Sequence, residues 1–351
     1  MGPPVRIVLL GGGVHPIPPT GYGAIERIVT DLAAALRAAG DEVEIVNRVR
    51  HERMRDEYPF ARELPRLLAG RSYDVLHANT PVVANRLAAR HLPFVYTSHS
   101  RHWYYRTQWT HRWGYWLERR AVRRSAEAIA LTPRLARTFA EVVRPAPPRV
   151  SVVPFGVEAA QFRPRWERRT GRRAVGVGVV LPFKRWELAA RALRGTGIEL
   201  TIVGPTPSDE YARRVKESGD RVVLRGEVPP EEHRALLAES DLLLHPSAVE
   251  ILSAAVLEGL AAGLPVLGGP ALDGVVDAGA TGWIEDDRDP TAFVAALRAR
   301  AVALAGAPDL RRRTGEAARA VAIERYAWPA IAAAHRAIYQ RVAARTPAAG
   351  R

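Results

Sequence analysis

Residues 241–269 read DLLLHPSAVEILSAAVLEGLAAGLPVLGG, and this stretch decides the fold class. It begins with a short apolar run, 241–245, that predicts a buried strand. Ser253, a good N-cap residue, then begins a helical segment, and a second apolar run follows at 265–267. Strand, helix and strand in this order predict parallel strands joined by a crossover helix, which is the repeating unit of an α/β sheet.

The same alternation fills the chain in two series of predicted strands. The first series is 5–10, 43–46, 74–77, 94–97, 128–131 and 150–153, and the second is 174–180, 200–203, 222–225, 241–245 and 265–267. A turn-rich stretch, 155–172, separates the two series. We therefore predict two Rossmann-like, doubly wound domains, residues 1–157 and 158–325, and a final helix and tail, residues 326–351, that crosses back. Ligands of such sheets lie beyond the carboxyl ends of the strands, so we expect a ligand in a cleft where the two domains face each other.

The composition excludes several classes of protein. The chain has 351 residues, a formal charge of +14 and no cysteine, which rules out a disulfide scaffold, an Fe–S cluster, a zinc–thiolate site and a cysteine nucleophile. The longest apolar candidate, 253–267, is interrupted by Glu258 and is shorter than the roughly 20 residues of a spanning helix. The sequence has no ligand cluster at metal spacing. We expect a cytoplasmic protein that needs no metal or other cofactor and that contacts something acidic.

Two glutamates flank the start of the helix predicted in residues 241–269. Glu250 precedes Ser253, and Glu258 lies inside the helix, about 12 Å away at a rise of ~1.5 Å per residue, which is too far for a shared-proton pair. The free backbone N–H groups at the helix start suit a diphosphate. We interpret the two glutamates as groups that bind hydroxyls on opposite sides of that diphosphate. The alternative is an ordinary amphipathic helix with two solvated glutamates.

Five segments, in order along the chain, resemble the motifs of one known family. They are 18–26 (PPTGYGAIE), 153–164 (VPFGVEAAQFRP), 178–184 (GVVLPFK), 250–258 (EILSAAVLE) and 326–328 (YAW). Together they resemble the retaining GT-B glycosyltransferases of family 4 over nearly the whole chain. The resemblance implies a GT-B fold and transfer of a sugar from a nucleotide-diphosphate donor, a UDP- or GDP-sugar, to an acceptor hydroxyl on a lipid-linked molecule, another glycan or a natural product. It further implies retention at the anomeric carbon without a metal, with the donor on the C-terminal domain and the acceptor on the N-terminal one.

The resemblance also implies residues for the donor site. Gly21 and Gly23 lie in the loop beside the donor phosphates, where glycine lets the backbone approach closely. Leu252 and Ser253 stand where the family has Phe-Gly, so backbone N–H donors are retained. Glu258 is expected to bind the ribose of the nucleotide.

Lysine is rare in this chain, which draws attention to Lys184. Of the 51 basic residues only Lys184 and Lys216 are lysines, and Lys184 falls at the motif position. We predict that its ammonium stabilises the charge that develops on the departing diphosphate, whereas Lys216 is solvated surface. The family's arginine, five residues before the lysine, is Val179 here. We expect Arg185, or else Arg27, to take its place.

Three histidines stand at the ends of predicted strands. His99 occupies the position where the family carries a histidine that faces the donor sugar, and with Lys184 and Glu250 it completes the predicted catalytic residues. His77 and His245 also end strands. We interpret both of these as structural.

Residues 101–124 hold half of the eight tryptophans, seven arginines and a single glutamate. Trp109, Trp113 and Trp116 recur at helical spacing and so share one face. That face either packs into the first domain or forms an interfacial patch for an anionic membrane or a lipid-linked acceptor, peripheral at the inner face of the membrane. The residues of such a patch are Trp103, Arg106, Trp109, Arg112, Trp113 and Trp116.

Two alternatives from other classes remain open. One is a basic nucleic-acid-binding protein, but the sequence contains no recognisable RNA- or DNA-reading module, so we expect no nucleic-acid partner. The other is a GT-B-like enzyme of different chemistry, such as a sugar-nucleotide epimerase. The partners that we expect are a nucleotide sugar and an acceptor glycan, lipid or small molecule.

Overall fold

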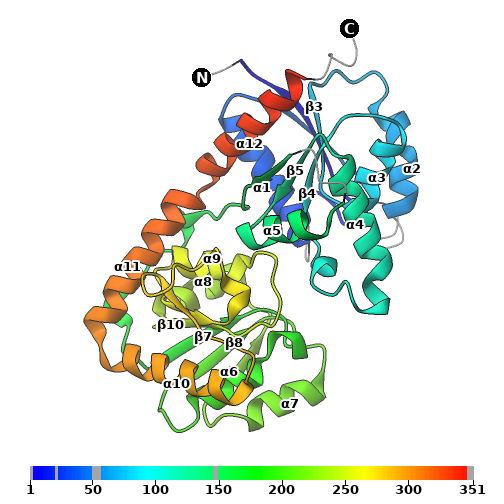
Figure 1. Cartoon of the computed structure of the whole chain (residues 1–351). Helices are drawn as coiled ribbons and strands as arrows, with labels where there is room; N and C mark the ends of the chain where they lie inside the picture. Colours follow the sequence, from blue (N-terminus) through cyan, green and yellow to red (C-terminus); the bar gives the residue numbers. More distant parts are fainter. Residues whose placement is uncertain (1–2, 20–22, 50–56, 145–148, 346–351) are drawn as a thin grey trace. The chain divides into compact units, whose positions relative to one another are not determined.

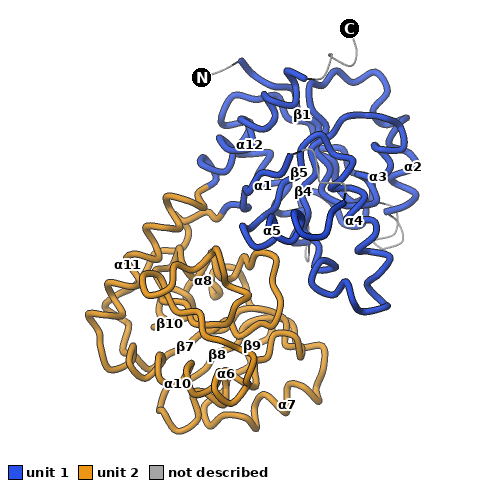
Figure 2. The backbone as a smooth tube through the Cα atoms, in the orientation of Figure 1, with its two compact units in different colours: residues 1–156, 328–351 blue, residues 157–327 orange. Residues whose placement is uncertain are grey.

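The computed structural model describes residues 3–19, 23–49, 57–144 and 149–345. The chain forms two compact units, drawn in different colours in Figure 2. Unit 1 contains residues 1–156 and 328–351, and unit 2 contains residues 157–327. The final helix is thus part of unit 1, together with the N-terminal half of the chain.

Unit 1 is built around a six-stranded parallel sheet of order β2-β1-β3-β4-β5-β6. Its elements are β1 (Arg6–Leu10), α1 (Ala24–Ala38), β2 (Glu42–Val46), α2 (Glu57–Leu68), β3 (Val75–Ala78), α3 (Pro81–Ala89), β4 (Val95–Ser98), α4 (Arg112–Arg124), β5 (Glu127–Ala130), α5 (Pro133–Val142), β6 (Val150–Val152) and α12 (Trp328–Ala343). Two short 3-10 helices, η2 (Arg101–Trp103) and η3 (Trp109–His111), lie between β4 and α4. The strand order reverses beside β1, which is the position where doubly wound sheets open a site at their carboxyl edge.

Helix α12 is held in unit 1 by buried polar contacts as well as by apolar packing beside α1 (Figure 1). Arg336 Nε lies 2.8 Å from Asp41 Oδ2, and Arg341 donates to Glu127 Oε1 at 2.7 Å. Both carboxylates are buried. Unpaired charges in such surroundings are costly, so these two ion pairs specify where the helix docks.

Unit 2 contains a second six-stranded parallel sheet, of order β12-β11-β10-β7-β8-β9. Its elements are β7 (Arg173–Val177), η6 (Pro182–Lys184), α6 (Trp186–Leu193), β8 (Glu199–Val203), α7 (Asp209–Glu217), β9 (Val222–Gly226), α8 (Pro230–Glu239), β10 (Leu242–His245), α9 (Ala254–Ala261), β11 (Val266–Gly268), β12 (Gly282–Ile284), α10 (Pro290–Gly306) and α11 (Pro308–Arg325). The order reverses between β10 and β7, so the loops after these two strands leave the sheet at its switch point.

The predicted strands are present in both sheets, with boundaries that differ by one to three residues. The strand predicted at 174–180 ends at Val177, because Gly178 has a φ of +143° and turns the chain out of the sheet. The edge strand β12 was not predicted. None of the helices in the described ranges is long and apolar enough to cross a membrane.

Candidate active site

The loop after β7 is shaped by glycine and by a buried tryptophan. A Cβ on Gly178 would lie 3.1 Å from Lys184 Cε, and one on Gly204 would lie 2.4 Å from the carbonyl oxygen of Gly178. Trp186 is fully buried and donates its indole N–H to the carbonyl of Val179 at 3.1 Å. These contacts place the loop against the carboxyl edge of the sheet and direct Lys184 toward the neighbouring strand β10.

Lys184, Glu250 and His245 form a compact cluster in unit 2. The Lys184 ammonium donates to Glu250 Oε1 at 2.5 Å, and His245 Nε2 lies 3.1 Å from the same oxygen. The Lys184 and Glu250 side chains are only 11% and 13% exposed, and His245 is fully buried at the end of β10. Both contacts converge on Oε1, so the other carboxylate oxygen of Glu250 takes part in neither.

The cluster keeps Glu250 ionised. Burial by itself would raise the pKa of this carboxyl, but the hydrogen bond from His245 and the charge of Lys184 outweigh it and hold the pKa well below its ordinary value. Burial lowers the pKa of His245, more than the contact with Glu250 raises it. His245 Nδ1 and Ser247 Oγ are buried without a hydrogen-bond partner in the described part of the chain. The site thus presents a fixed cation and a fixed carboxylate side by side.

Arg185 holds the turn after β10 together. It adopts the left-handed conformation, with a φ of +54°, and its Nε donates to the carbonyl of Pro246 at 2.7 Å. Its terminal nitrogen donates to Asp287 Oδ2, also at 2.7 Å. Arg185 therefore lies next to the cluster but is already paired, and its role as a substitute for the family's arginine stays a prediction.

Helix α9 begins directly beyond the cluster, with Ser253 at the N-cap as predicted. The Ser253 side chain makes no capping hydrogen bond. The N–H groups of the first turn are thus not satisfied by a side-chain cap, which is the state in which a helix start binds an anion. Further along, Glu258 contacts His233 Nε2 at 2.8 Å. Leu252 is buried beside this helix start.

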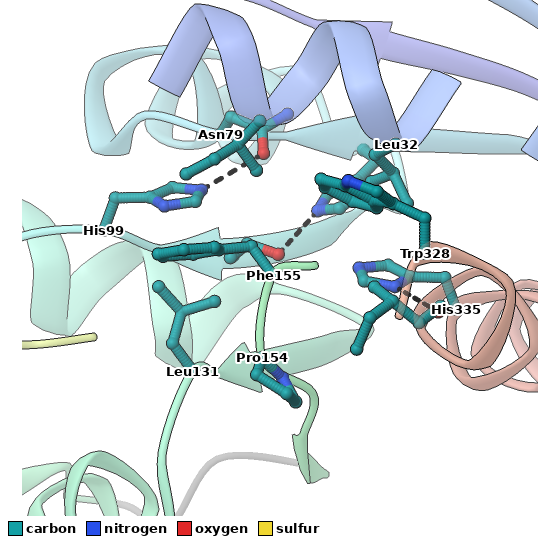
Figure 3. Close-up of a pocket in the computed structure, with 12 residues that line it drawn as sticks. Leu32, Asn79, His99, Leu131, Pro154, Phe155, Trp328 and His335 are labelled. Atoms are coloured by element: carbon teal, nitrogen blue, oxygen red, sulfur yellow. Dashed lines mark hydrogen bonds between the residues drawn. The ribbon is translucent and has the colours of Figure 1, made fainter. Parts of the chain in front are cut away.

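Unit 1 has a small pocket at the carboxyl edge of its sheet, drawn in Figure 3. His99 and Asn79 face each other across it, with His99 Nε2 3.4 Å from Asn79 Oδ1. The Asn79 amide nitrogen donates to the carbonyl of Leu10 at 3.3 Å, and this assigns its oxygen to the His99 side. The other lining residues are Ile28, Leu32, His77, Thr97, Leu131, Pro154, Phe155, Trp328, Ile331 and His335.

Three histidines around this pocket are kept neutral at pH 7. Burial and the nearby His335 lower the pKa of His99 to about 4, and burial lowers that of His335 to about 4 as well. His77 is fully buried between Tyr339 Oη at 2.7 Å and Thr97 Oγ1 at 2.8 Å, and burial holds its pKa well below the ordinary value. Neutral His99 can accept a hydrogen bond from a hydroxyl group.

Known proteins match both halves of the chain. The family model Glycosyltransferase Family 4 matches residues 25–161, and the family model Glycosyl transferases group 1 matches residues 178–300. The chain belongs to glycosyltransferase family 4. This glycosyltransferase is 28% identical over 318 residues to the MMP α-(1→4)-mannosyltransferase of Mycolicibacterium hassiacum, a match that covers 82% of this chain and 76% of that protein.

Solved structures show the same GT-B fold. Sucrose-phosphate synthase from Thermosynechococcus elongatus matches with a TM-score of 0.79 at 19% identity, over 97% of the glycosyltransferase and 99% of that chain. The Anabaena protein HepE, solved in complex with UDP-glucose, matches with a TM-score of 0.70 at 17% identity, over 97% and 99% of the two chains. The predicted fold class is thereby confirmed.

The predicted site residues of the glycosyltransferase are divided between the two units. Lys184 and Glu250 are in direct contact beside the start of α9, whereas His99 lies in the unit 1 pocket. Gly23 immediately precedes α1, and Gly21 lies outside the described residues. Arg27, on the first turn of α1, is exposed.

The patch predicted in residues 101–124 needs one correction. Trp103 is fully buried: its indole donates to Ser98 at 2.9 Å and its ring packs on Phe139, so it cannot belong to a surface. Trp109, Trp113 and Trp116 are exposed, so the alternative that their face packs into the domain is wrong. Arg106 and Arg112 are exposed beside them.

Several contacts and residues of these sites could not be identified from the sequence. His245, interpreted as structural, is fully buried and contacts Glu250, which is consistent with that interpretation. Asn79 directly follows β3, at the same sheet edge as His99, and that position is a signal that could have found it. Asp287 lies far along the chain from its partner Arg185, and His335 lies far from His77, whose ring it contacts. No local sequence pattern identifies either residue.

Proposed function

We propose that this family 4 glycosyltransferase moves a sugar from a UDP- or GDP-sugar to an acceptor hydroxyl with retention at the anomeric carbon and without a bound metal. The observation that carries the proposal is the Lys184–Glu250–His245 cluster beside the start of α9. A cation, a carboxylate and the backbone N–H groups of a helix start that no side chain caps are suited to the recognition of a sugar diphosphate.

Each group has a distinct part in this proposal. The N–H groups at the start of α9 and the Lys184 ammonium bind the diphosphate and stabilise the negative charge that it gains as the glycosidic bond breaks. Glu250 accepts hydrogen bonds from hydroxyls of the donor sugar through the oxygen that does not contact Lys184. His245 fixes the orientation of that carboxylate.

The acceptor is bound by unit 1 in this proposal. The bond from the anomeric carbon to the diphosphate oxygen breaks, the acceptor oxygen bonds to the same face of the sugar, and the acceptor proton passes to the departing phosphate. No protein nucleophile is then needed. Neutral His99 accepts a hydrogen bond from a sugar hydroxyl.

One comparison supports sugar transfer and another supports a nucleotide-sugar donor. The relative from Mycolicibacterium hassiacum is named as a mannosyltransferase, and HepE was solved with UDP-glucose. The acceptor is proposed only by class, as a hydroxyl of a glycan, a lipid-linked molecule or a small natural product. In this proposal Lys184, whose ammonium contacts Glu250 beside the start of α9, supplies the positive charge.

Thermal unfolding with UDP, GDP, ADP and TDP and their sugars tests the donor site. A ligand at ~100 times its Kd stabilises the folded protein by about 2.7 kcal/mol, which shifts the Tm of a unit of this size by roughly 5–11 °C. We expect one nucleotide class to give this shift in the wild type and in Lys216→Met but not in Lys184→Met. No shift with any nucleotide would refute the donor site.

Product analysis with the labelled donor then tests the reaction. We expect acceptor-dependent transfer, an unchanged anomeric configuration by NMR, and activity that survives EDTA. Release of an epimerised sugar nucleotide without an acceptor would instead identify an epimerase. An inverted product or loss of activity with EDTA would refute the corresponding part of the proposal.

A further inference from the structure

Unit 1 carries an exposed aromatic surface that the proposed transfer reaction does not use. It consists of Tyr58 on α2, Trp109 in η3, and Trp113 and Trp116 on α4, which are 43%, 82%, 62% and 46% exposed. Seven large apolar side chains are exposed in the described ranges, and these are four of them. Contiguous apolar groups of this kind mark interaction sites, whereas scattered ones need no explanation.

Three of the four aromatic side chains, Tyr58, Trp113 and Trp116, contact one another. The rings of Trp113 and Trp116 stack at 5.1 Å with an angle of 17° between their planes. The Trp113 indole donates to the Tyr58 hydroxyl at 3.2 Å, and the Arg120 guanidinium lies 5.7 Å from the centre of the Trp116 ring. The result is a broad apolar face with polar N–H and O–H groups at its margin.

The segment that carries the three exposed tryptophans is strongly basic. Seven arginines lie between residues 101 and 124: Arg101, Arg106, Arg112, Arg119, Arg120, Arg123 and Arg124. The single acid of that segment, Glu118, is on the buried side of α4, where it accepts from Tyr96 and Ser98. Burial raises its pKa to about 7, and burial raises that of Glu57, next to Tyr58, to about 7 as well. Both acids are therefore less ionised at pH 7 than an exposed glutamate.

We propose that this surface binds the headgroup region of an anionic lipid bilayer. Tryptophan and tyrosine favour the boundary between headgroups and acyl chains, because a flat apolar ring with one polar group fits there. Arginine is attracted by the negative surface potential of such a bilayer. The surface lies on η3 and α4, with one residue on α2, so it attaches to the membrane without a spanning segment. This inference does not depend on the identity of the donor or the acceptor.

Co-sedimentation of the full-length protein with vesicles tests the proposal. We expect binding to vesicles of phosphatidylcholine mixed with phosphatidylglycerol, much weaker binding to phosphatidylcholine alone, and release at an ionic strength of about 1 M, where the Debye length falls to about 3 Å. Trp113→Ser combined with Trp116→Ser is expected to abolish binding. Arg112→Gln is expected to weaken it by about fivefold, as the attraction of one arginine to the anionic surface predicts.

Matched substitutions in unit 2 distinguish binding by this surface from non-specific electrostatic or hydrophobic binding elsewhere on the protein. Val302→Ser and Ile323→Ser remove two other exposed apolar side chains, and Arg213→Gln removes an exposed arginine. We expect all three variants to bind the anionic vesicles like the wild type. Equal loss in these controls, or equal binding to both kinds of vesicle at all salt concentrations, would overturn the proposal. It would also be overturned if the tryptophan variants lost binding to a neutral polysaccharide or to a second copy of the chain while still binding the vesicles.

Discussion

The buried ion pair between Lys184 and Glu250 makes a prediction about stability that is separate from catalysis. Lys184→Met keeps a side chain of similar length and removes the charge. Glu250 would then be a nearly buried carboxylate that keeps its contact with His245 but has lost its cationic partner. Removing one partner of such a pair costs about 3–5 kcal/mol, because the remaining charge is left uncompensated.

The expected change in melting temperature follows from this value. Unit 2 spans residues 157–327, and for a unit of that size 1 kcal/mol corresponds to roughly 2–4 °C. A loss of about 3 kcal/mol therefore predicts that the transition of unit 2 falls by roughly 6–12 °C at pH 7. Lys216→Met, at the exposed second lysine, is the matched control and is expected to be within about 0.5 kcal/mol of the wild type.

The difference in stability between Lys184→Met and the wild type should depend on pH. The folded pKa of Glu250 lies below its ordinary value, so the ion pair contributes stability above that ordinary value, and the contribution is lost as the pH falls through the folded pKa. Without Lys184, burial raises the pKa and Glu250 takes up a proton more easily. The stability gap between Lys184→Met and wild type should therefore narrow between pH 7 and about pH 4.

Urea unfolding of the two single variants and of the Lys184→Met/Glu250→Gln double variant completes the test. We expect the double variant to be more stable than the sum of the single losses, by 1 kcal/mol or more, because it leaves no buried unpaired charge. Two results would refute the reasoning: losses that simply add, or a Lys184→Met variant as stable as Lys216→Met.

Three further predictions concern unit 1. Asn79→Ala should lower kcat by about tenfold, because His99 loses the acceptor that orients it; steady-state kinetics should show no further loss of kcat when the substitution is added to His99→Ala. Glu118→Gln should stabilise unit 1 above pH 7 by up to about 3 kcal/mol and have little effect near pH 5. The reason is that the folded pKa of Glu118 is raised to about 7, so the wild type loses stability as the pH rises through that value and Glu118 becomes ionised. Equal effects of the substitution in urea unfolding at both pH values would contradict this. Tyr339→Phe should cost about 1–3 kcal/mol in the same measurement, because buried His77 Nδ1 loses its partner, and an unchanged midpoint would argue against that hydrogen bond.

Much of the fold could be predicted because its signals are local. The run of leucines at 242–244, the N-cap position of Ser253 and the apolar run at 265–267 each read correctly as strand, helix start and strand. Strand β12 was missed because Gly282–Ile284 has only three residues, and its pairing with β11 stabilises it rather than its own sequence. Gly178 ended β7 earlier than the valines on either side of it suggest.

The sequence predicted which residues belong to the candidate site, but it did not predict which of them contact one another. The motif spacing picked out Lys184 and Glu250, yet nothing local shows that two residues 66 positions apart share an ion pair, or that His245 joins them. Arg185 was expected to be a cation available to phosphate, and its pairing with Asp287 depends on a loop about 100 residues further along the chain.

The tryptophans of residues 101–124 show what the sequence determines and what only the tertiary structure determines. Helical spacing predicts that Trp109, Trp113 and Trp116 share one face, and all three are exposed, whereas the inclusion of Trp103 in the patch was wrong because it is buried. Periodicity shows which side chains share a face, because the backbone fixes their directions. Whether that face is buried, and which buried charges find partners, depends on desolvation by segments distant in sequence, and only the packed chain brings those segments together.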